Sequence, residues 1–196
     1  MTGQRLLQYL TNKYPLGNDF RSALLKCATQ LTLPKNHYLL EAPRVADHMF
    51  FLEKGFALSY TYFDGTKQVD KFWTTGDLII SVKSFFQQQP SLEYIRLMTE
   101  SDVVFISHTD AQRLFDEFRE GRYLYSAIMN RYYESEYQRV SSFRHHTAWE
   151  RYHALKAAFP GIEQLVSQEH IASYIGVTPQ SLSRMKSSRN DLSNDK

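Results

Sequence analysis

The sequence predicts an α+β protein, with an antiparallel β-roll or jelly roll in its N-terminal part and helices in its C-terminal part. Three observations lead to this class. Short apolar runs separated by turn residues follow one another from residue 31 to residue 106, the spacing typical of antiparallel strands. Residues 122–146 contain neither Gly nor Pro, which predicts one long helix. Two short helices joined by a tight turn are predicted within residues 167–186.

The composition sets the class of protein before any motif is considered. A chain of 196 residues with 42% hydrophobic residues can form one large domain or two small ones with a packed core. The formal net charge of +2 is too small to identify a nucleic-acid binder, although the basic surface can be local. Cys27 is the one cysteine, which excludes an intramolecular disulfide. Without a signal peptide or a long apolar segment, we expect a cytoplasmic protein that does not enter a membrane.

The strand-rich part begins near residue 31 and is punctuated by turn signals. Asp64–Gly65 is the strongest hairpin signal in the chain, because both positions of a two-residue turn favour these residue types. The predicted strands are Leu39–Leu40, Met49–Leu52, Phe56–Tyr62, Gln68–Trp73, Tyr94–Met98 and Val103–Ile106. We expect a first domain over residues 1–120, a long helix over 121–146 and a helical domain over 147–196.

The long helix carries a mixed apolar and polar stripe. Its members are Tyr125, Ile128, Tyr132, Ser135, Arg139 and Phe143. At about 1.5 Å per residue the helix is well over 30 Å long, more than a small domain needs for its own core. We therefore expect these residues to form a seam between two subunits. The alternative is a core helix that crosses a single subunit.

The two short helices have start and stop signals at each required offset. Ser167 is a candidate N-cap of the first helix, and Gly176 can end it at positive φ. Thr178 is the second N-cap, and Pro179 occupies the first helical position, where its missing N–H has no consequence. Ala172 allows the second helix to cross close to the first.

This spacing is the pattern of a helix-turn-helix, whose second helix enters the DNA major groove. Gln180, Ser181 and Arg184 would point outward from that helix. Arginine can bridge O6 and N7 of guanine, and glutamine can bridge N6 and N7 of adenine. The alternative is an ordinary helical hairpin within a core.

The sequence resembles the Crp/Fnr regulators over nearly its whole length. Lys54–Gly55, Asp64–Gly65 and Gly76–Asp77 are similar to their cyclic-nucleotide-binding-like β-roll, and the stretch 171–184 resembles the subgroup common in Bacteroidetes. The resemblance implies a cyclic-nucleotide-binding-like effector domain over residues 1–120, a dimerisation helix over 121–146 and a helix-turn-helix domain over 147–196. It implies a homodimeric transcription regulator that binds an inverted repeat in double-stranded DNA, with RNA polymerase as a further candidate partner.

The resemblance also assigns the DNA contacts. Base-reading positions fall on the predicted second helix, and phosphate-contacting positions fall at the start of the first. The candidate DNA-binding residues are Ser167, Gln168, Thr178, Gln180, Ser181, Arg184, Lys186 and Arg189. The chain ends too soon after this helix for a full wing of two strands, so we expect a reduced or absent wing, with Lys186 and Arg189 in place of its phosphate contacts.

The effector pocket departs from the pattern of the cyclic-AMP binders. Those proteins place a Gly-Glu pair on the ribose and an Arg-Ser or Arg-Ala pair on the cyclic phosphate, whereas this chain has apolar residues after Gly-Asp and Ser-Leu at the later position. The positions of this degenerate pocket are Gly76, Asp77, Ile80, Ser81, Ser91, Leu92 and Arg96. We expect no useful binding of cyclic AMP, an effector of unknown identity and no cofactor.

Two other classes of protein were weighed. One is a small-molecule-binding β-roll module that does not bind DNA. The other is a cupin-like metalloenzyme, which would use His37, His48 or His108. None of these histidines has a second ligand at metal-binding spacing, and no nucleophile or phosphate-loop motif occurs. We therefore expect neither a metal site nor an enzyme.

Overall fold

The computed structural model describes residues 3–193, with side chains for residues 3–188. The chain forms two compact units. The first comprises Met1–Ser59 and Phe72–Ser135, and the second comprises Tyr60–Lys71 and Glu136–Lys196. The division therefore runs through the long helix, and a segment of the strand-rich part joins the C-terminal unit. Neither boundary coincides with those expected at residues 120 and 146.

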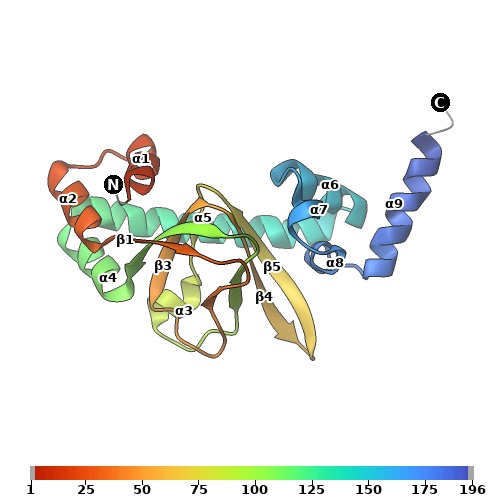
Figure 1. The fold of residues 1–196 in the computed structure, drawn as a ribbon, viewed down its shortest axis with the longest axis horizontal. Coiled ribbons are helices and arrows are strands. Elements are labelled where there is room, and N and C mark those ends of the chain that lie inside the picture. The colour runs from red at the N-terminus through yellow and green to blue at the C-terminus, as the bar shows by residue number, and fades with distance from the viewer. Residues whose placement is uncertain (1–2, 194–196) are drawn as a thin grey trace. The chain divides into compact units, whose positions relative to one another are not determined.

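The strands form two four-stranded antiparallel sheets (Figure 1). The first has the order β1-β8-β3-β6, with β1 (Thr29–Leu33), β8 (Ser101–Ser107), β3 (His48–Lys54) and β6 (Leu78–Ile79). The second has the order β2-β7-β4-β5, with β2 (Tyr38–Leu40), β7 (Tyr94–Leu97), β4 (Phe56–Phe63) and β5 (Thr66–Thr74). The α+β class with an antiparallel β-roll is confirmed. Strands β1 and β6 had not been assigned from the sequence.

The turn between β4 and β5 has the predicted chemistry. Asp64 has φ of 48° and Gly65 has φ of 71°. Positive φ at both central residues defines a type I′ turn, whose twist matches that of the strands it joins. The hairpin is therefore fixed by its own two turn residues.

Helices cover the β-roll within the first unit. They are α1 (Gln4–Lys13), α2 (Asn18–Cys27), α3 (Val82–Gln87), α4 (His108–Glu117) and the first part of α5 (Arg119–His145). Figure 1 shows α5 as one continuous helix. It continues through Gly121, where a Cβ would lie 1.9 Å from the carbonyl oxygen of Leu114. Glycine is thus needed here for close approach of the α5 and α4 backbones, and it does not interrupt the helix.

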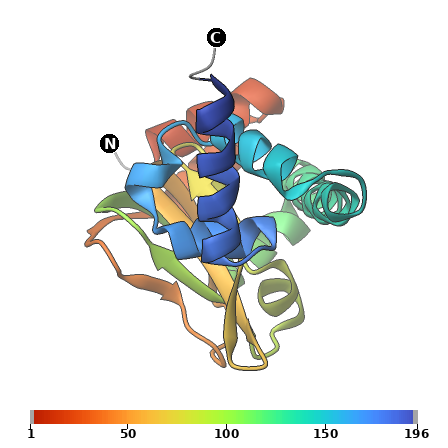
Figure 2. The same ribbon diagram turned by 90° about the vertical axis from the view of Figure 1, so that its right-hand side faces the viewer.

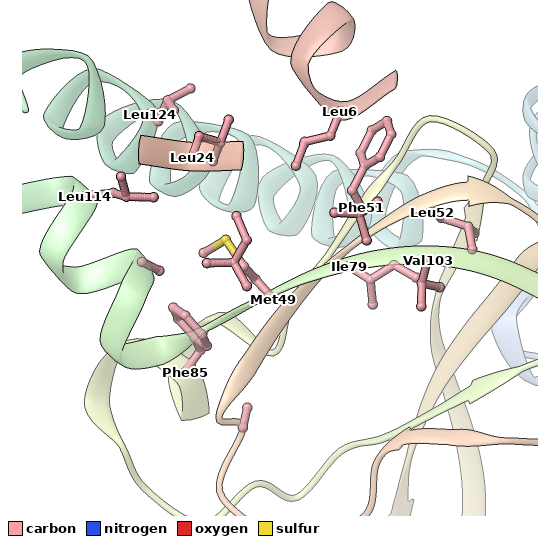
Figure 3. Close-up of a cluster of buried hydrophobic side chains, with 14 of the residues drawn as sticks. Leu6, Leu24, Met49, Phe51, Leu52, Ile79, Phe85, Val103, Leu114 and Leu124 are labelled. Carbon is pink, nitrogen blue, oxygen red and sulfur yellow. The ribbon is translucent and has the colours of Figure 1, made fainter. Parts of the chain in front are cut away.

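The core of the first unit lies between the β-roll and these helices (Figure 3). Phe51 and Ile79 from the first sheet are at most 3% exposed, and Leu24 and Leu114 from α2 and α4 are each 3% exposed. Burying side chains of this size stabilises the fold by about 1.5–3 kcal/mol each. This core accounts for the short apolar runs that predicted the strands.

The C-terminal helices lie in the second unit. They are α6 (Ala148–Ala158), α7 (Ile162–Leu165), α8 (Gln168–Ile175) and α9 (Pro179–Ser193). Figure 2 shows α9, in dark blue, viewed from the side. Within the part of the chain that the structure describes, no strand follows α9, and no helix is long and apolar enough to cross a membrane.

Candidate nucleic-acid interface

Helix α8 begins and ends at the residues that the sequence indicated. The Ser167 hydroxyl accepts a hydrogen bond from the His170 amide over 3.3 Å, as an N-cap does. Gly176 has φ of 74°, in the left-handed region that disfavours residues with a Cβ. A Cβ at this position would also lie 2.5 Å from a ring carbon of Phe143. Both conformation and space therefore require glycine at the end of α8.

The turn between α8 and α9 is closed by backbone and side-chain hydrogen bonds. The Val177 amide donates to the carbonyl of Ala172 over 2.9 Å. Thr178 Oγ1 accepts from the Ser181 amide over 3.1 Å and donates to the Ser181 hydroxyl over 3.0 Å. Thr178 is thus the N-cap of α9, and Pro179 is its first residue.

One side of α9 packs on α8. Leu182 is 0% exposed, as are Ile171, Ala172 and Ile175 of α8. Ala172 has only a methyl group, which allows the two helix backbones to approach. Because four fully buried residues hold α9 on one side, its opposite side is fixed in orientation.

That opposite side forms a polar stripe, which we call the outward stripe. Gln180, Ser183, Arg184 and Ser187 are exposed, and their positions i, i+3, i+4 and i+7 place them on one side of the helix. Among the side chains that the structure describes, the Arg184 guanidinium has no partner. Ser181 is exposed beside the stripe. The sequence prediction missed Ser183 and Ser187, although the helical spacing from Gln180 could have indicated them.

A cluster of polar side chains around Glu163 lies within the same unit. The carboxylate accepts a hydrogen bond from the Tyr152 hydroxyl over 2.9 Å, forms an ion pair with Lys186 and lies 3.5 Å from Lys156 Nζ. The hydrogen bond from Lys186 is the largest cause that lowers the pKa of Glu163 to about 2, and a hydrogen bond from the Gln168 side chain adds to it. Burial and the hydrogen bond to Glu163 raise the pKa of Tyr152 to about 12. No local pattern in the sequence indicated this cluster, because its members are up to 23 residues from Glu163 along the chain.

Most of the predicted phosphate contacts have a structural role. The hydroxyls of Ser167 and Thr178 cap helices α8 and α9. The Lys186 ammonium is engaged by Glu163, and Gln168 is exposed in the first turn of α8. The side chain of Arg189 lies outside the described residues.

Strand β5 of the β4–β5 hairpin contacts α8 and α5 within the second unit. The Ser173 hydroxyl accepts from the Val69 amide over 2.9 Å and donates to the Lys67 carbonyl over 3.1 Å. The Arg139 guanidinium donates to the carbonyls of Val69 and Asp70 over 3.1 and 2.9 Å. Burial raises the pKa of Asp70, although the charge of Arg139 opposes the effect. These contacts satisfy the open edge of β5.

The predicted effector pocket is divided in the structure. A cavity of about 10 Å³ lies inside the β-roll, lined by Ile80, Ser81 and Ile95 among others, and it has room for no more than about one water molecule. Ser91 is buried, 3.5 Å from the Ser81 hydroxyl. Leu92 is 80% exposed and contributes nothing to the cavity.

The remaining predicted pocket residues lie elsewhere. Gly76–Asp77 forms a turn in which the Asp77 carboxylate accepts from the Thr74 amide and pairs with Arg131 of α5, each over 2.9 Å. Arg96 follows Ile95 in β7, so its side chain lies on the other face of the sheet. Its guanidinium is 5.8 Å from the centre of the Tyr38 ring. The structure thus offers the cavity no cationic side chain from these positions.

Part of the strand-rich region matches a family model. Residues 30–118 match the model of the cyclic nucleotide-binding domain family. Among solved structures, a protein from Eubacterium rectale assigned to the Crp/Fnr family of transcriptional regulators is 12% identical. It aligns with a TM-score of 0.72 over 89% of this chain and 85% of its own. This chain has the fold of the Crp/Fnr regulators.

Two further structures share the Crp/Fnr fold with the chain. The c-di-GMP responsive global regulator CLP from Xanthomonas campestris is 14% identical, with a TM-score of 0.70 over 89% of this chain and 93% of its own. FixK2 from Bradyrhizobium japonicum is 17% identical, with a TM-score of 0.69 over 85% of this chain and 86% of its own. No curated protein matches the sequence.

In α5, much of the stripe that was predicted to form the seam between subunits instead makes contacts within its own chain. Tyr125 makes edge contacts with Phe86 and Phe115, and Ile128 packs against the core. Arg139 holds the hairpin. Of the predicted seam, Tyr132 is half-buried, and Ser135 and Phe143 are exposed.

A different face of α5 is apolar and open. Tyr133, Tyr137 and Val140 are 65%, 69% and 51% exposed, respectively, and their spacing of four and three residues places them on one side of the helix. The predicted stripe lies about a third of a turn around the helix from them. The sequence pattern did not separate the two stripes, because both are rich in tyrosine.

The residues that the structure describes include no cluster of metal ligands. Among the described residues, no three His, Cys, Asp or Glu side chains are close enough to hold a metal ion. Of the histidines considered, His48 pairs with Asp47 over 2.6 Å, and His108 packs against Phe85 with ring centres 5.1 Å apart.

Proposed function

We propose that this protein is a homodimeric, sequence-specific DNA-binding transcription regulator. The observation that carries the proposal is the outward stripe of α9, which is exposed while Leu182 on the opposite side of the helix is fully buried against α8. In a helix-turn-helix this is the side that enters the major groove. The Crp/Fnr fold supports the same role.

Arg184 and Gln180 are the proposed base-reading residues. They are one helical turn apart and exposed, and Arg184 has no partner among the described side chains. The arginine fork can donate two hydrogen bonds to guanine, and the glutamine amide can pair with adenine. Ser181 and Ser183 flank them and can reach a base edge or a phosphate.

A second copy of the chain is the proposed occupant of the open face of α5. Tyr133, Tyr137 and Val140 supply an apolar strip that a symmetry-related helix would cover. Two recognition helices on a twofold axis would meet major grooves about 34 Å apart, which selects an inverted repeat. We therefore place the seam on this strip instead of on the stripe that contains Tyr125 and Arg139.

The β-roll is proposed to have a degenerate effector site. A cavity of about 10 Å³ cannot hold a nucleotide, and no arginine faces it from the predicted positions. A buried cyclic phosphate needs a cation or several oriented N–H groups, since an unpaired buried charge is very costly. We propose that cyclic AMP is not the signal for this protein.

Selection of bound sequences from random double-stranded DNA tests the proposal. We expect an enriched inverted repeat whose half-sites are one helical turn apart, with guanine at the position read by Arg184. Enrichment of a single, unrepeated site would contradict the dimer. The absence of any enriched sequence would contradict sequence-specific binding and favour a β-roll module without DNA binding.

A further inference from the structure

Lys186 lies on the inward side of α9. It follows Leu182 by four residues, so both side chains leave the same face of the helix. Leu182 is 0% exposed, and the Lys186 side chain is 34% exposed. Its ammonium is 5.8 Å from the centre of the Tyr152 ring and forms an ion pair with Glu163. The Lys186 ammonium is therefore directed away from the outward stripe.

The Glu163 carboxylate is the partner of the Lys186 ammonium. It thus holds a cation that would otherwise be available to contact DNA phosphates. The Glu163 side chain is itself only 30% exposed, so the pair is partly shielded from water.

We propose that Glu163 is a specificity-determining positioning residue, which withholds Lys186 from the DNA backbone. This inference rests on the proposed DNA binding. Phosphate contacts increase affinity for every sequence alike, whereas base contacts discriminate among sequences. Because Glu163 neutralises Lys186, the contacts of α9 with DNA come from its outward stripe. A chain without this carboxylate binds DNA more tightly but less selectively.

The salt dependence of binding measures the number of phosphates neutralised. Each additional contact steepens the slope of log affinity against log salt by about 0.9 for duplex DNA. We expect Glu163→Gln to add one contact in each chain, or about 1.8 to the slope of a dimer. A fourfold increase in salt then weakens the variant about twelvefold more than the unchanged protein. At low salt, the ratio of specific to non-specific affinity is lower for Glu163→Gln than for the unchanged protein.

Three matched variants isolate the contribution of Lys186. Glu169→Gln removes the same charge from an exposed residue of α8 and controls for the general loss of negative charge. Lys186→Met in the otherwise unchanged chain should leave the slope as it is. The double variant Glu163→Gln/Lys186→Met should return to the slope of the unchanged protein. Circular dichroism confirms that each variant is folded.

The readout is titration of a labelled random-sequence duplex with each full-length variant over a series of salt concentrations. Equal slopes for Glu163→Gln and Glu169→Gln would overturn the inference. A shallower slope for Lys186→Met alone would also overturn the inference, because Lys186 would then already contact phosphate in the unchanged protein. This measurement does not depend on any substitution at Glu163. If the unchanged protein binds no DNA, the proposed function fails as well. Binding with unaltered slopes would overturn only the role of Glu163.

Discussion

Replacing Arg184 by alanine is the most direct perturbation of the proposed base contacts. The side chain is exposed and has no partner among the described side chains, so its removal leaves the packing of α9 unchanged. The buried residues that hold the helix, led by Leu182, are on the opposite side. We therefore expect the melting temperature to be unaffected, since surface substitutions away from buried packing residues usually change stability by less than about 0.5 kcal/mol.

The expected loss of affinity follows from the number of contacts. One bidentate contact between arginine and a base contributes about 1–3 kcal/mol. A dimer presents Arg184 twice, so the two half-sites lose about 2–6 kcal/mol together. This corresponds to a loss of specific affinity of about 30-fold at the least and on the order of 10⁴-fold at the most, because 1.4 kcal/mol is a factor of ten. Affinity for random sequence should fall much less.

The assay is a competition titration of the selected operator against random duplex DNA, at one fixed salt concentration. Arg184→Lys keeps the charge but loses the fork, and it should lose nearly as much specificity as the alanine variant. Arg144→Ala removes an exposed charge from the last turn of α5 and should affect both duplexes equally. If Arg184→Ala weakened specific and random binding by the same factor, Arg184 would contact phosphate, and the assignment of base reading would be refuted.

Four further predictions concern the rest of the molecule. Ser173→Ala should leave the Val69 amide without its partner, reduce the unfolding free energy by about 1–3 kcal/mol and abolish hydrogen-exchange protection at that amide. Because the pKa of Glu163 is lowered in the folded state, its ionisation stabilises the folded protein at pH values above 4.5, the ordinary pKa of the group. This stabilisation is lost as the pH falls toward about 2. Glu163→Gln should therefore flatten the acid-unfolding curve between those values, followed by circular dichroism. Tyr137→Glu should give a monomer in light scattering, whereas Ser135→Glu, on the opposite side of α5, should not. Calorimetry with cyclic AMP should show no saturable binding below about millimolar, because the burial of a phosphate without a cation is very costly.

Each of these predictions has a contrary outcome. Retained protection of the Val69 amide in Ser173→Ala would mean that the hairpin is held by other contacts. An unchanged acid-unfolding curve in Glu163→Gln would contradict the pKa assignment. A dimer that survives Tyr137→Glu but not Ser135→Glu would move the seam back to the stripe containing Tyr125. A micromolar affinity for cyclic AMP that disappears in Arg96→Ala would show that Arg96 enters the pocket.

The parts of the fold that local signals control were predictable from the sequence. The caps Ser167 and Thr178 and the stop at Gly176 act within four residues of their own positions, so their roles could be read from spacing. Asp64–Gly65 fixed the hairpin for the same reason. The role of Gly121 could not be predicted, because close approach of its backbone to α4 is a tertiary property.

The contacts that define the candidate site depend on residues far apart in the chain. Glu163 meets Lys186 across 23 residues, and Ser173 meets the hairpin across more than 100. No periodicity encodes such pairs. The face of α5 that remains open could not be chosen either, because that choice requires knowing which side packs against Phe86 and which side meets solvent.

The outer part of the β4–β5 hairpin has a consequence for any attempt to transplant helices α8 and α9. Tyr60–Lys71 belongs to the same compact unit as α8 and α9, although more than sixty residues of other structure separate it from them in the chain. A fragment cut from the chain at the start of that unit's second segment would lack the backbone groups that Ser173 and Arg139 bind. A chimeric regulator built from this protein must therefore bring its own hairpin with its helices, and the unit that evolution can exchange is not contiguous in the gene.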